Sequence, residues 1–144
     1  MNTHISVTNT LSPETQMKME NGLKSYELSH GINVDYQPII LELLNETNEL
    51  IGVLDAFSSY SCVHIRDLWV NDAYRGKGHG RQLIEALEKH CKHAGFHNIN
   101  TVSCDFQAPD FYKKCGFQVE FVRKNLINPK LTMIFFIKLL PTNK

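Results

Sequence analysis

The feature that most restricts the fold is an apolar strand, a glycine-rich turn and an amphipathic helix in direct succession over residues 62–94. The segment 62–70 (CVHIRDLWV) alternates at first and ends in a continuous apolar run, which predicts a strand. The turn at 75–80 reads RGKGHG. Beyond it, apolar residues recur at helical spacing and charged residues take the other face. The apolar members are Leu83, Ile84, Leu87, Cys91 and Ala94. This unit predicts the centre of a domain that mixes strands and helices.

The remaining elements follow from the same periodicities. Ser12, Pro13 and Gly31 mark the start and end of a helix over 13–30. Two apolar runs around a short polar turn predict an antiparallel hairpin before the central unit, and further runs follow it. The predicted strands are 36–44, 49–57, 98–104, 117–123 and 131–139, and a short helix is predicted at 109–115. Because the sequence shows no repeat and no linker, it predicts one α+β domain over 1–144 with a largely antiparallel sheet.

The composition is typical of a soluble globular protein, since 42% of the 144 residues are hydrophobic and 21% are charged. Fifteen basic and fifteen acidic side chains give a formal net charge of zero. Because nucleic acids and membrane surfaces attract a basic excess, we expect neither as a partner. No apolar run approaches the roughly 20 residues of a membrane span. The run at 132–140 is too short and contains Lys138.

The cysteines and histidines indicate neither a disulfide framework nor a metal site. The four cysteines lack CxxC spacing, and the polar residues 1–10 do not form a signal peptide. We therefore expect reduced thiols and a cytoplasmic protein. His90, Cys91, His93 and His97 spread around a helix and beyond its end, so that no single face gathers four ligands. We expect no bound metal.

The glycine-rich turn has the properties of an anion site. The first amides of a helix lack internal partners, and the helix dipole adds positive potential at the same end. Glycine lets the backbone approach an anion, and the turn also carries Arg75, Lys77, His79 and Arg81. Two phosphate motifs do not fit: a dinucleotide fingerprint that starts at Gly76 needs glycine in place of Arg81, and a P-loop needs a longer segment. The alternative interpretation is a glycine loop that only joins two elements.

A third pattern fits the turn. The hexapeptide RGKGHG at 75–80 resembles the Arg/Gln-x-x-Gly-x-Gly/Ala signature of the GNAT superfamily, the CoA-dependent N-acetyltransferases. Downstream, the segment 106–117 (FQAPDFYKKCGF) is similar to the family's second signature, an Ala followed by Phe-Tyr and then Gly-Phe. The resemblance covers 36–139 well and the first helix more loosely. It implies a three-layer α/β/α fold whose mixed, largely antiparallel sheet splays apart beside the first signature.

The resemblance implies acetyl-CoA as the co-substrate and a place for each of its parts. In the family, the strand before the turn pairs with the pantetheine arm, and the amides at 76–81 hold the pyrophosphate. Tyr112 stands where the family's tyrosine reaches the CoA sulfur, and Asp105 stands where many members have Asn. The cofactor-binding residues implied in this way are Leu68, Trp69, Val70, Arg75, Gly76, Lys77, Gly78, His79, Gly80, Arg81, Asp105, Phe111 and Tyr112.

The implied chemistry is direct attack of an amine on the thioester. An alkylamine with a pKa near 10 is neutral in less than about one part in a thousand at pH 7, so a base must take its proton. His64 and Asp67 are the candidate bases, and we place Asp67 slightly ahead. Each also has a structural interpretation: His64 as a satisfied strand residue, and Asp67 as a partner of Arg66 or a cap of a bulge. Tyr112 is the candidate acid for the thiolate, or else a ring that only packs against the pantetheine.

We therefore predict an acetyl-CoA-dependent N-acetyltransferase that acts on a primary amine, with a small molecule as the first choice. A protein amino group is the alternative acceptor, and a non-catalytic acetyl-CoA-binding or interaction module is the alternative function. The acceptor side is expected at 13–35, 57–62 and 124–130, which hold no dense acidic cluster and no obvious peptide groove. A homodimer is also allowed.

Overall fold

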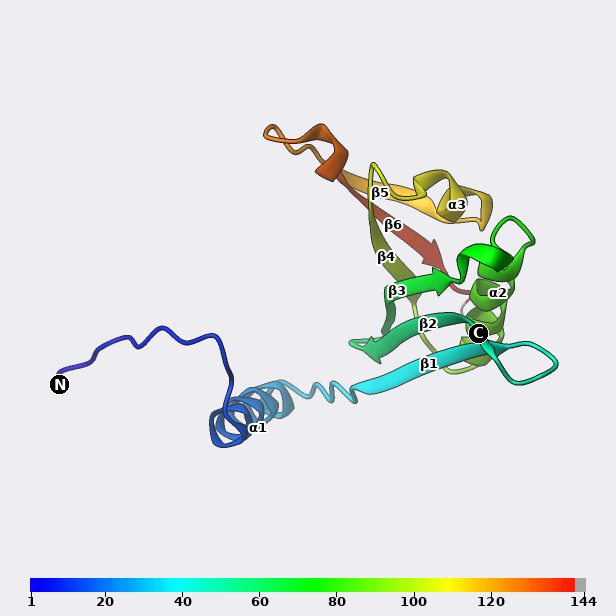
Figure 1. Ribbon diagram of the computed structural model, residues 1–144. Coiled ribbons are helices and arrows are strands. Elements are labelled where there is room, and N and C mark those ends of the chain that lie inside the picture. The colour runs from blue at the N-terminus through cyan, green and yellow to red at the C-terminus, as the bar shows by residue number, and fades with distance from the viewer. Residues whose placement is uncertain (142–144) are drawn as a thin grey trace. The chain divides into compact units, whose positions relative to one another are not determined.

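The chain divides into two units, Met1–Val34 and Asp35–Lys144. The structure, a computed structural model, describes residues 1–141 (Figure 1). Within these residues the second unit holds all the strands and two of the three α-helices. The single domain over 1–144 stays a prediction.

The first unit contains helix α1, Pro13–Ser29, which ends within one residue of the predicted boundary. Its start follows the expected cap, because the Ser12 side chain accepts a hydrogen bond from the backbone N–H of Thr15. After the helix, Gly31 adopts a left-handed φ of +73°. No residue of α1 is buried, so its apolar side chains lie at the surface of this unit.

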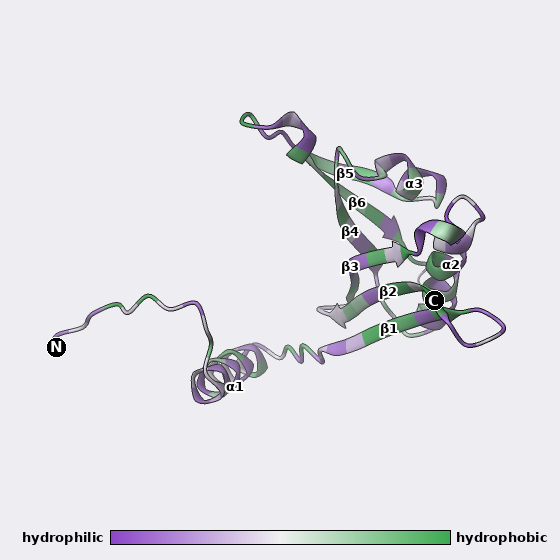
Figure 2. Cartoon of the chain, viewed as in Figure 1, coloured by the Kyte–Doolittle hydropathy of each residue, from purple (hydrophilic) through white to green (hydrophobic). Residues whose placement is uncertain are grey.

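The second unit is built on one mixed sheet, whose strands are largely hydrophobic (Figure 2). The strands are β1 Gln37–Leu44, β2 Leu50–Ser59, β3 Cys62–Val70, β4 Asn98–Cys104, β5 Gln118–Arg123 and β6 Met133–Leu139. Their order across the sheet is β1-β2-β3-β4-β6-β5. Only the central neighbours β3 and β4 run parallel, and the other four pairs are antiparallel. The predicted α+β class and the largely antiparallel sheet are confirmed.

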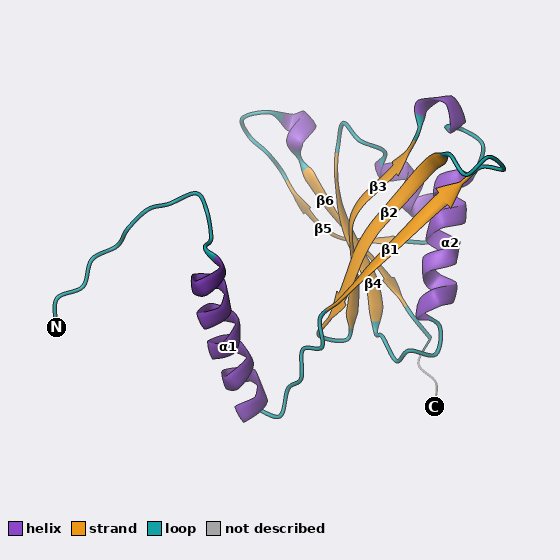
Figure 3. Cartoon of the chain, turned by 60° about the horizontal axis from the view of Figure 1, so that its bottom comes forward, coloured by secondary structure: helices purple, strands orange, loops and turns teal. Residues whose placement is uncertain are grey.

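Helix α2, His79–Cys91, lies along one face of the sheet (Figure 3). Its buried side chains are Leu83, Ile84, Leu87 and Cys91, which pack with Leu54, Val63, Ile65, Ile99 and Phe136 in the core. The prediction that Ala94 continues this helix is wrong, since Ala94 is exposed and outside it. The helix ends earlier because Lys92 is extended and His93 takes a left-handed φ of 70°. A short helix, α3 Pro109–Lys114, connects β4 and β5.

The sheet splays between its two parallel strands. β3 and β4 pair only from Cys62 to Ile65 on one side and from Asn98 to Thr101 on the other. Beyond that point β3 continues to Val70 with β2 alone as its neighbour in the sheet. The predicted splay therefore begins directly after Ile65.

A β-bulge marks the same point. On β2, Ala56 lies opposite Ile65 and Asp55 lies opposite Asp67, which leaves Arg66 as the extra residue of β3. The bulge changes which residues of β3 face the core. Before it, the odd-numbered Val63 and Ile65 are buried, and after it, the even-numbered Leu68 and Val70 are partly buried. Irregular backbone and a diverging neighbour thus coincide at one place in the sheet.

Candidate cofactor and catalytic site

The turn between β3 and α2 presents backbone amides that no capping side chain occupies. Gly76 and Gly78 have φ values of +74° and +85°, and Gly78 is the N-cap of α2 without a side-chain cap. A Cβ atom at either glycine would meet nothing within 4 Å, so the backbone conformation rather than space requires glycine here. The arrangement leaves the first amides of α2 open to an anion.

The cationic side chains of the turn are exposed and engaged with the turn itself. Arg75 donates from Nε to the Val70 carbonyl at 3.0 Å and pairs with Asp72 at 3.0 Å, which ties the turn to the end of β3. Arg81 pairs with Glu85 at 3.3 Å, one turn along α2. Two weaker contacts accompany these: the Lys77 ammonium lies 5.8 Å from the Tyr74 ring centroid, and His79 Nδ1 lies 3.2 Å from Gln82 Oε1. The Arg75 guanidinium therefore positions the loop, and both guanidinium groups raise its local potential.

The end of β3 offers a free backbone edge beside the turn. Residues 66–70 have no partner on β4, because the two strands have separated. The Leu68 and Val70 side chains are half-buried against the core, and Trp69 is 44% exposed on the other face. An extended ligand can therefore run along Leu68, Trp69 and Val70 and use their backbone groups as a strand would.

Tyr112, on α3, reaches toward the point where β3 and β4 separate. Its ring packs against Phe111, Phe117 and Phe136, with centroid distances of 5.2, 5.6 and 5.5 Å. Burial raises the pKa of its hydroxyl above the ordinary 10.0, a hydrogen bond with the Thr101 side chain opposes the rise, and Asp67 adds a smaller increase. The hydroxyl is therefore protonated at neutral pH and is available as an acid.

Thr101 is a site residue that the sequence did not reveal. It is only 3% exposed, and its hydroxyl donates to the Ile65 carbonyl at 3.0 Å. Ile65 is the last residue of β3 that pairs with β4. The alternation of β4 placed Thr101 on the inner face, but nothing in the pattern distinguished it from a structural threonine.

The glycine turn and α3 meet at Gly80 and Phe111. A Cβ atom at Gly80 would lie 3.1 Å from the Phe111 ring, closer than side chains ordinarily pack. Glycine here has a steric reason, unlike at the two preceding glycines. The contact brings the N-terminal end of α2 against the helix that carries Tyr112.

The two candidate bases occupy different environments. Asp67 is exposed in the splayed part of β3, opposite Asp55 on β2, and its charge affects the pKa of Tyr112. His64 lies in the paired part of β3, where its Nδ1 is 2.7 Å from Asn100 Oδ1. Asn100 in turn donates to Asn98 Oδ1 at 2.8 Å. His64 thus sits in a polar chain that satisfies a strand residue, and Asp67 faces the open region.

Arg66 has its own partners away from Asp67. Its guanidinium donates to the Tyr36 hydroxyl at 3.1 Å and lies 4.5 Å above the Phe57 ring centroid. The interpretation of Asp67 as the partner of Arg66 receives no support from these contacts. Asp105, the other acidic candidate, is exposed after β4, and its backbone N–H donates to the Thr132 carbonyl at 2.9 Å.

The described residues, 1–141, hold neither a candidate metal site nor a helix that could span a membrane. No group of three or more histidine, cysteine or acidic side chains is placed to hold a metal ion. No helix in the same range is long and apolar enough to cross a membrane.

Curated proteins similar to this chain include two acetyltransferases. The glucosamine 6-phosphate N-acetyltransferase of Arabidopsis thaliana is 38% identical over 53 residues, which are 37% of this chain and 35% of that protein. The blasticidin-S acetyltransferase of Streptomyces morookaense is 33% identical over 75 residues, or 51% and 55% of the two chains. The matched part thus spans between a third and about half of these relatives.

Solved structures match over nearly the whole length. An acetyltransferase from Bacillus cereus ATCC 14579 superposes with a TM-score of 0.80 at 27% identity, covering 96% of this chain and 98% of that one. An aminoglycoside 6′-N-acetyltransferase complexed with coenzyme A has a TM-score of 0.66 at 17% identity, covering 96% and 98%. The latter likeness is one of fold.

The model of the acetyltransferase (GNAT) family matches residues 9–117, which include the glycine turn, α2 and α3. This confirms the resemblance carried by the two sequence signatures. The chain belongs to the acetyltransferase (GNAT) family.

Proposed function

We propose that the protein is an acetyl-CoA-dependent N-acetyltransferase that acetylates a primary amine of a small molecule by direct attack in a ternary complex. The observation that carries the proposal is the protonated phenol of Tyr112, which lies near the point where β3 and β4 separate. It is joined through the Phe111–Gly80 contact to a turn of open backbone amides. A protein that only binds acetyl-CoA has no need of an acid beside the sulfur. The family match supports the same reaction class.

The cofactor would lie across the turn and into the splay. The pyrophosphate would accept hydrogen bonds from the amides of 76–81, including those of Gly76, Gly78 and Gly80. The exposed Arg75, Lys77 and Arg81 and the partly buried His79 would add positive potential or donors there, and the pantetheine would follow Leu68–Val70. The bound coenzyme A of a structural relative supports this class of ligand. Asp105 is the weakest of the proposed contacts, because a carboxylate repels an anionic cofactor.

In the proposed reaction, Asp67 takes a proton from the ammonium group of the acceptor, directly or through water, and the neutral amine then attacks the thioester carbonyl carbon to form a tetrahedral intermediate. The carbon–sulfur bond then breaks, and the thiolate receives the Tyr112 proton. The nitrogen gives its second proton to the tyrosinate and Asp67 releases its proton to water, which leaves the amide, free CoA and the starting protein. Burial favours this role because it holds the proton on the phenol until the leaving group develops charge.

Two acidic residues support a cationic acceptor. Asp55 on β2 and Asp67 on β3 lie directly opposite each other, and like charges in that position destabilise a sheet. An ammonium group between them would relieve the repulsion and would also be the form in which an amine arrives at neutral pH. The names of two curated relatives, which refer to glucosamine 6-phosphate and blasticidin-S, support a small molecule as the acceptor, whereas another relative, from Glycine max, is named a histone acetyltransferase and is the reason to test protein amino groups in parallel.

The test is transfer of radiolabelled acetyl from acetyl-CoA to a panel of small amines and, in parallel, to peptides with free amino groups. We expect labelled small-molecule amide and stoichiometric free thiol, both reduced in Tyr112→Phe. Labelled peptide alone would change the acceptor class. Calorimetric binding of acetyl-CoA with no transfer to either panel would instead favour the binding module.

A further inference from the structure

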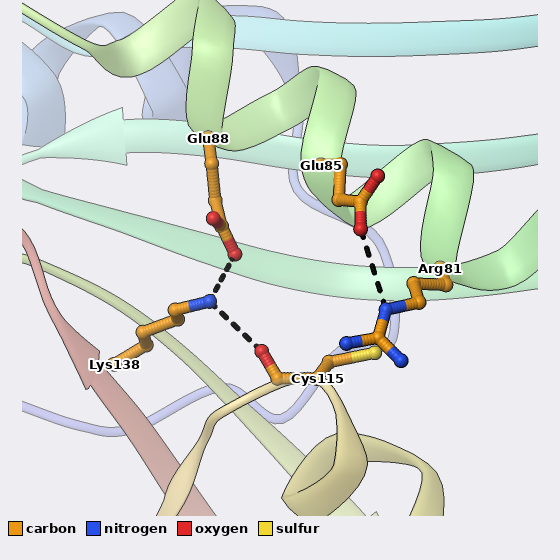
Figure 4. Close-up of polar contacts among 5 residues, drawn as sticks. All are labelled: Arg81, Glu85, Glu88, Cys115 and Lys138. Carbon is orange, nitrogen blue, oxygen red and sulfur yellow. Dashed lines mark hydrogen bonds and ion pairs between the residues drawn. The ribbon is translucent and has the colours of Figure 1, made fainter.

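Lys138, on β6, makes a three-way polar contact that the proposed function does not use (Figure 4). Its ammonium donates to Glu88 Oε1 on α2 at 2.6 Å and to the Cys115 carbonyl at the end of α3 at 2.8 Å. Both charged side chains are only 27% exposed, so the pair is shielded from water more than an ordinary surface ion pair. One side chain therefore joins three elements that flank the proposed cofactor site.

Resting on the proposed acetyltransferase function, we infer that Lys138 is a positioning residue: with Glu88, it holds the C-terminal end of α3 and so fixes where the Tyr112 hydroxyl stands. In this role Lys138 acts through its neighbours in the fold and not by contact with the cofactor or the acceptor.

Helix α3 needs such a contact because it has only six residues. A helix of this length is not stable by itself and depends on tertiary contacts. The Phe111, Tyr112 and Lys113 carbonyls accept hydrogen bonds from backbone N–H groups of the residues that follow α3. The carbonyl of the C-cap Cys115 accepts from the Lys138 ammonium. The cation lies at the negative end of the helix, where the interaction is favourable.

Gly116 shows that the chain makes room for this ammonium. Its φ is +91°, and a Cβ atom there would lie 3.1 Å from Lys138 Nζ. The glycine of the second signature thus serves two purposes: it reverses the chain after α3 and clears the space that the ammonium fills. The same ammonium lies 5.9 Å from the Phe117 ring centroid.

Backbone hydrogen bonds and one ring contact connect Tyr112 to the residues around the Lys138 ammonium. The Tyr112 carbonyl accepts hydrogen bonds from the backbone N–H groups of Cys115 at 3.1 Å and Phe117 at 3.0 Å. Its ring packs on Phe136, which lies two residues before Lys138 on β6. A displaced helix end would therefore move the phenol, and misplacement by about 1 Å can cost on the order of a hundredfold in rate.

The experiment is a double-mutant cycle on kcat. Lys138→Met keeps most of the side-chain stem and removes the ammonium, and it is made both in the natural chain and in Tyr112→Phe. We expect kcat to fall about tenfold or more in the natural chain, with the KM for acetyl-CoA within about twofold. In Tyr112→Phe the same substitution should change kcat by less than about twofold, because the group it positions is already gone.

Two further variants guard against a general loss of folding. Lys113→Met removes the exposed partner of Asp110 on the same helix, 3.8 Å away, and should leave kcat unchanged. Glu88→Gln keeps an oxygen acceptor for Lys138 and should give a smaller fall in kcat that again vanishes in Tyr112→Phe. This variant decides the matter if Lys138→Met does not fold.

Equal losses of kcat in both backgrounds would overturn the inference, because Lys138 would then act only through stability. So would an unchanged kcat in Lys138→Met while Tyr112→Phe is impaired, although the proposed function would stand. A natural chain that binds acetyl-CoA but transfers no acetyl group would overturn both.

Discussion

The two sides of the proposed cofactor site are built in opposite ways. The turn side is formed by residues 75–81 at the start of α2. Its important groups are backbone amides, Gly76 and Gly78 take left-handed φ values, and its charged side chains are exposed. The splay side is formed by α3 and the ends of β3 and β4 where these strands separate. Its important group is the phenol of Tyr112, which is carried by the six-residue helix α3 and packs among three aromatic rings. A site made of backbone tolerates most side-chain changes, whereas a site that depends on one side chain does not. Binding and chemistry should therefore respond to different substitutions.

The largest expected effect is on the splay side. Tyr112→Phe keeps the packed ring and deletes only the hydroxyl. Because general acids contribute about 10²–10⁴-fold, kcat should fall on that scale while calorimetric binding of acetyl-CoA changes little. The assay must be one in which chemistry limits the rate. A variant that keeps most of its turnover would reduce Tyr112 to a packing residue.

The same residue predicts a pH dependence. Burial raises the pKa of Tyr112, and the acid works only while it is protonated. As the pH rises, the kcat of the natural chain should therefore stay constant to a pH above 10.0 and fall only when the phenol ionises. Tyr112→Phe should lack this fall, which a pH profile of single-turnover rates would show. An alkaline fall of equal size in both proteins would assign it to another group.

The next effect concerns the base. Asp67→Asn should lower kcat/KM by about a hundredfold, since an amide cannot take a proton. His64→Gln is the matched change on the same strand, and it should matter little because His64 already bonds to Asn100. The reverse result would transfer the role to His64. If neither variant differs from the natural chain, the proton of the amine must leave through a chain of water molecules or by ionisation of the acceptor itself.

On the turn side, Gly78→Asp tests the backbone site. A carboxylate against the pyrophosphate should weaken CoA binding by about 10–100-fold in calorimetry. Gly78→Ala is the control, because its Cβ meets nothing within 4 Å and its cost is the left-handed φ of +85°, about 1–2 kcal/mol of stability. If the aspartate variant binds CoA as tightly as the alanine variant, the anion site is misplaced.

The turn side was also the more predictable of the two. Its strand, glycines and amphipathic helix are local patterns of spacing, and α2 buries four of the five positions that the spacing selected. The pattern failed at Ala94, which the spacing assigned to the helix. The backbone in fact leaves the helix three residues earlier, and His93 turns left-handed without any glycine.

The splay side depends on contacts that sequence spacing cannot encode. Arg66 becomes the bulged residue only through the register of β2 against β3, and its hydrogen-bond partner Tyr36 precedes β1. Lys138 and Glu88 are fifty residues apart. The family signature pointed to Tyr112, but the groups around it, Thr101 among them, emerge only when β4, α3 and β6 come together.

The smallest effect should come from the one contact that joins the two sides. Gly80→Ala places a methyl group 3.1 Å from the Phe111 ring, a distance that forces the ring to yield by a few tenths of an ångström. Because Phe111 belongs to the same short helix as Tyr112, kcat should fall by about two- to tenfold, whereas the affinity for CoA should change less. Phe111→Leu in the same chain shortens the opposing side chain and should restore much of the lost turnover, which a purely local strain in the turn would not allow. A loss of CoA affinity as large as the loss of kcat would show that the two sides do not separate binding from chemistry.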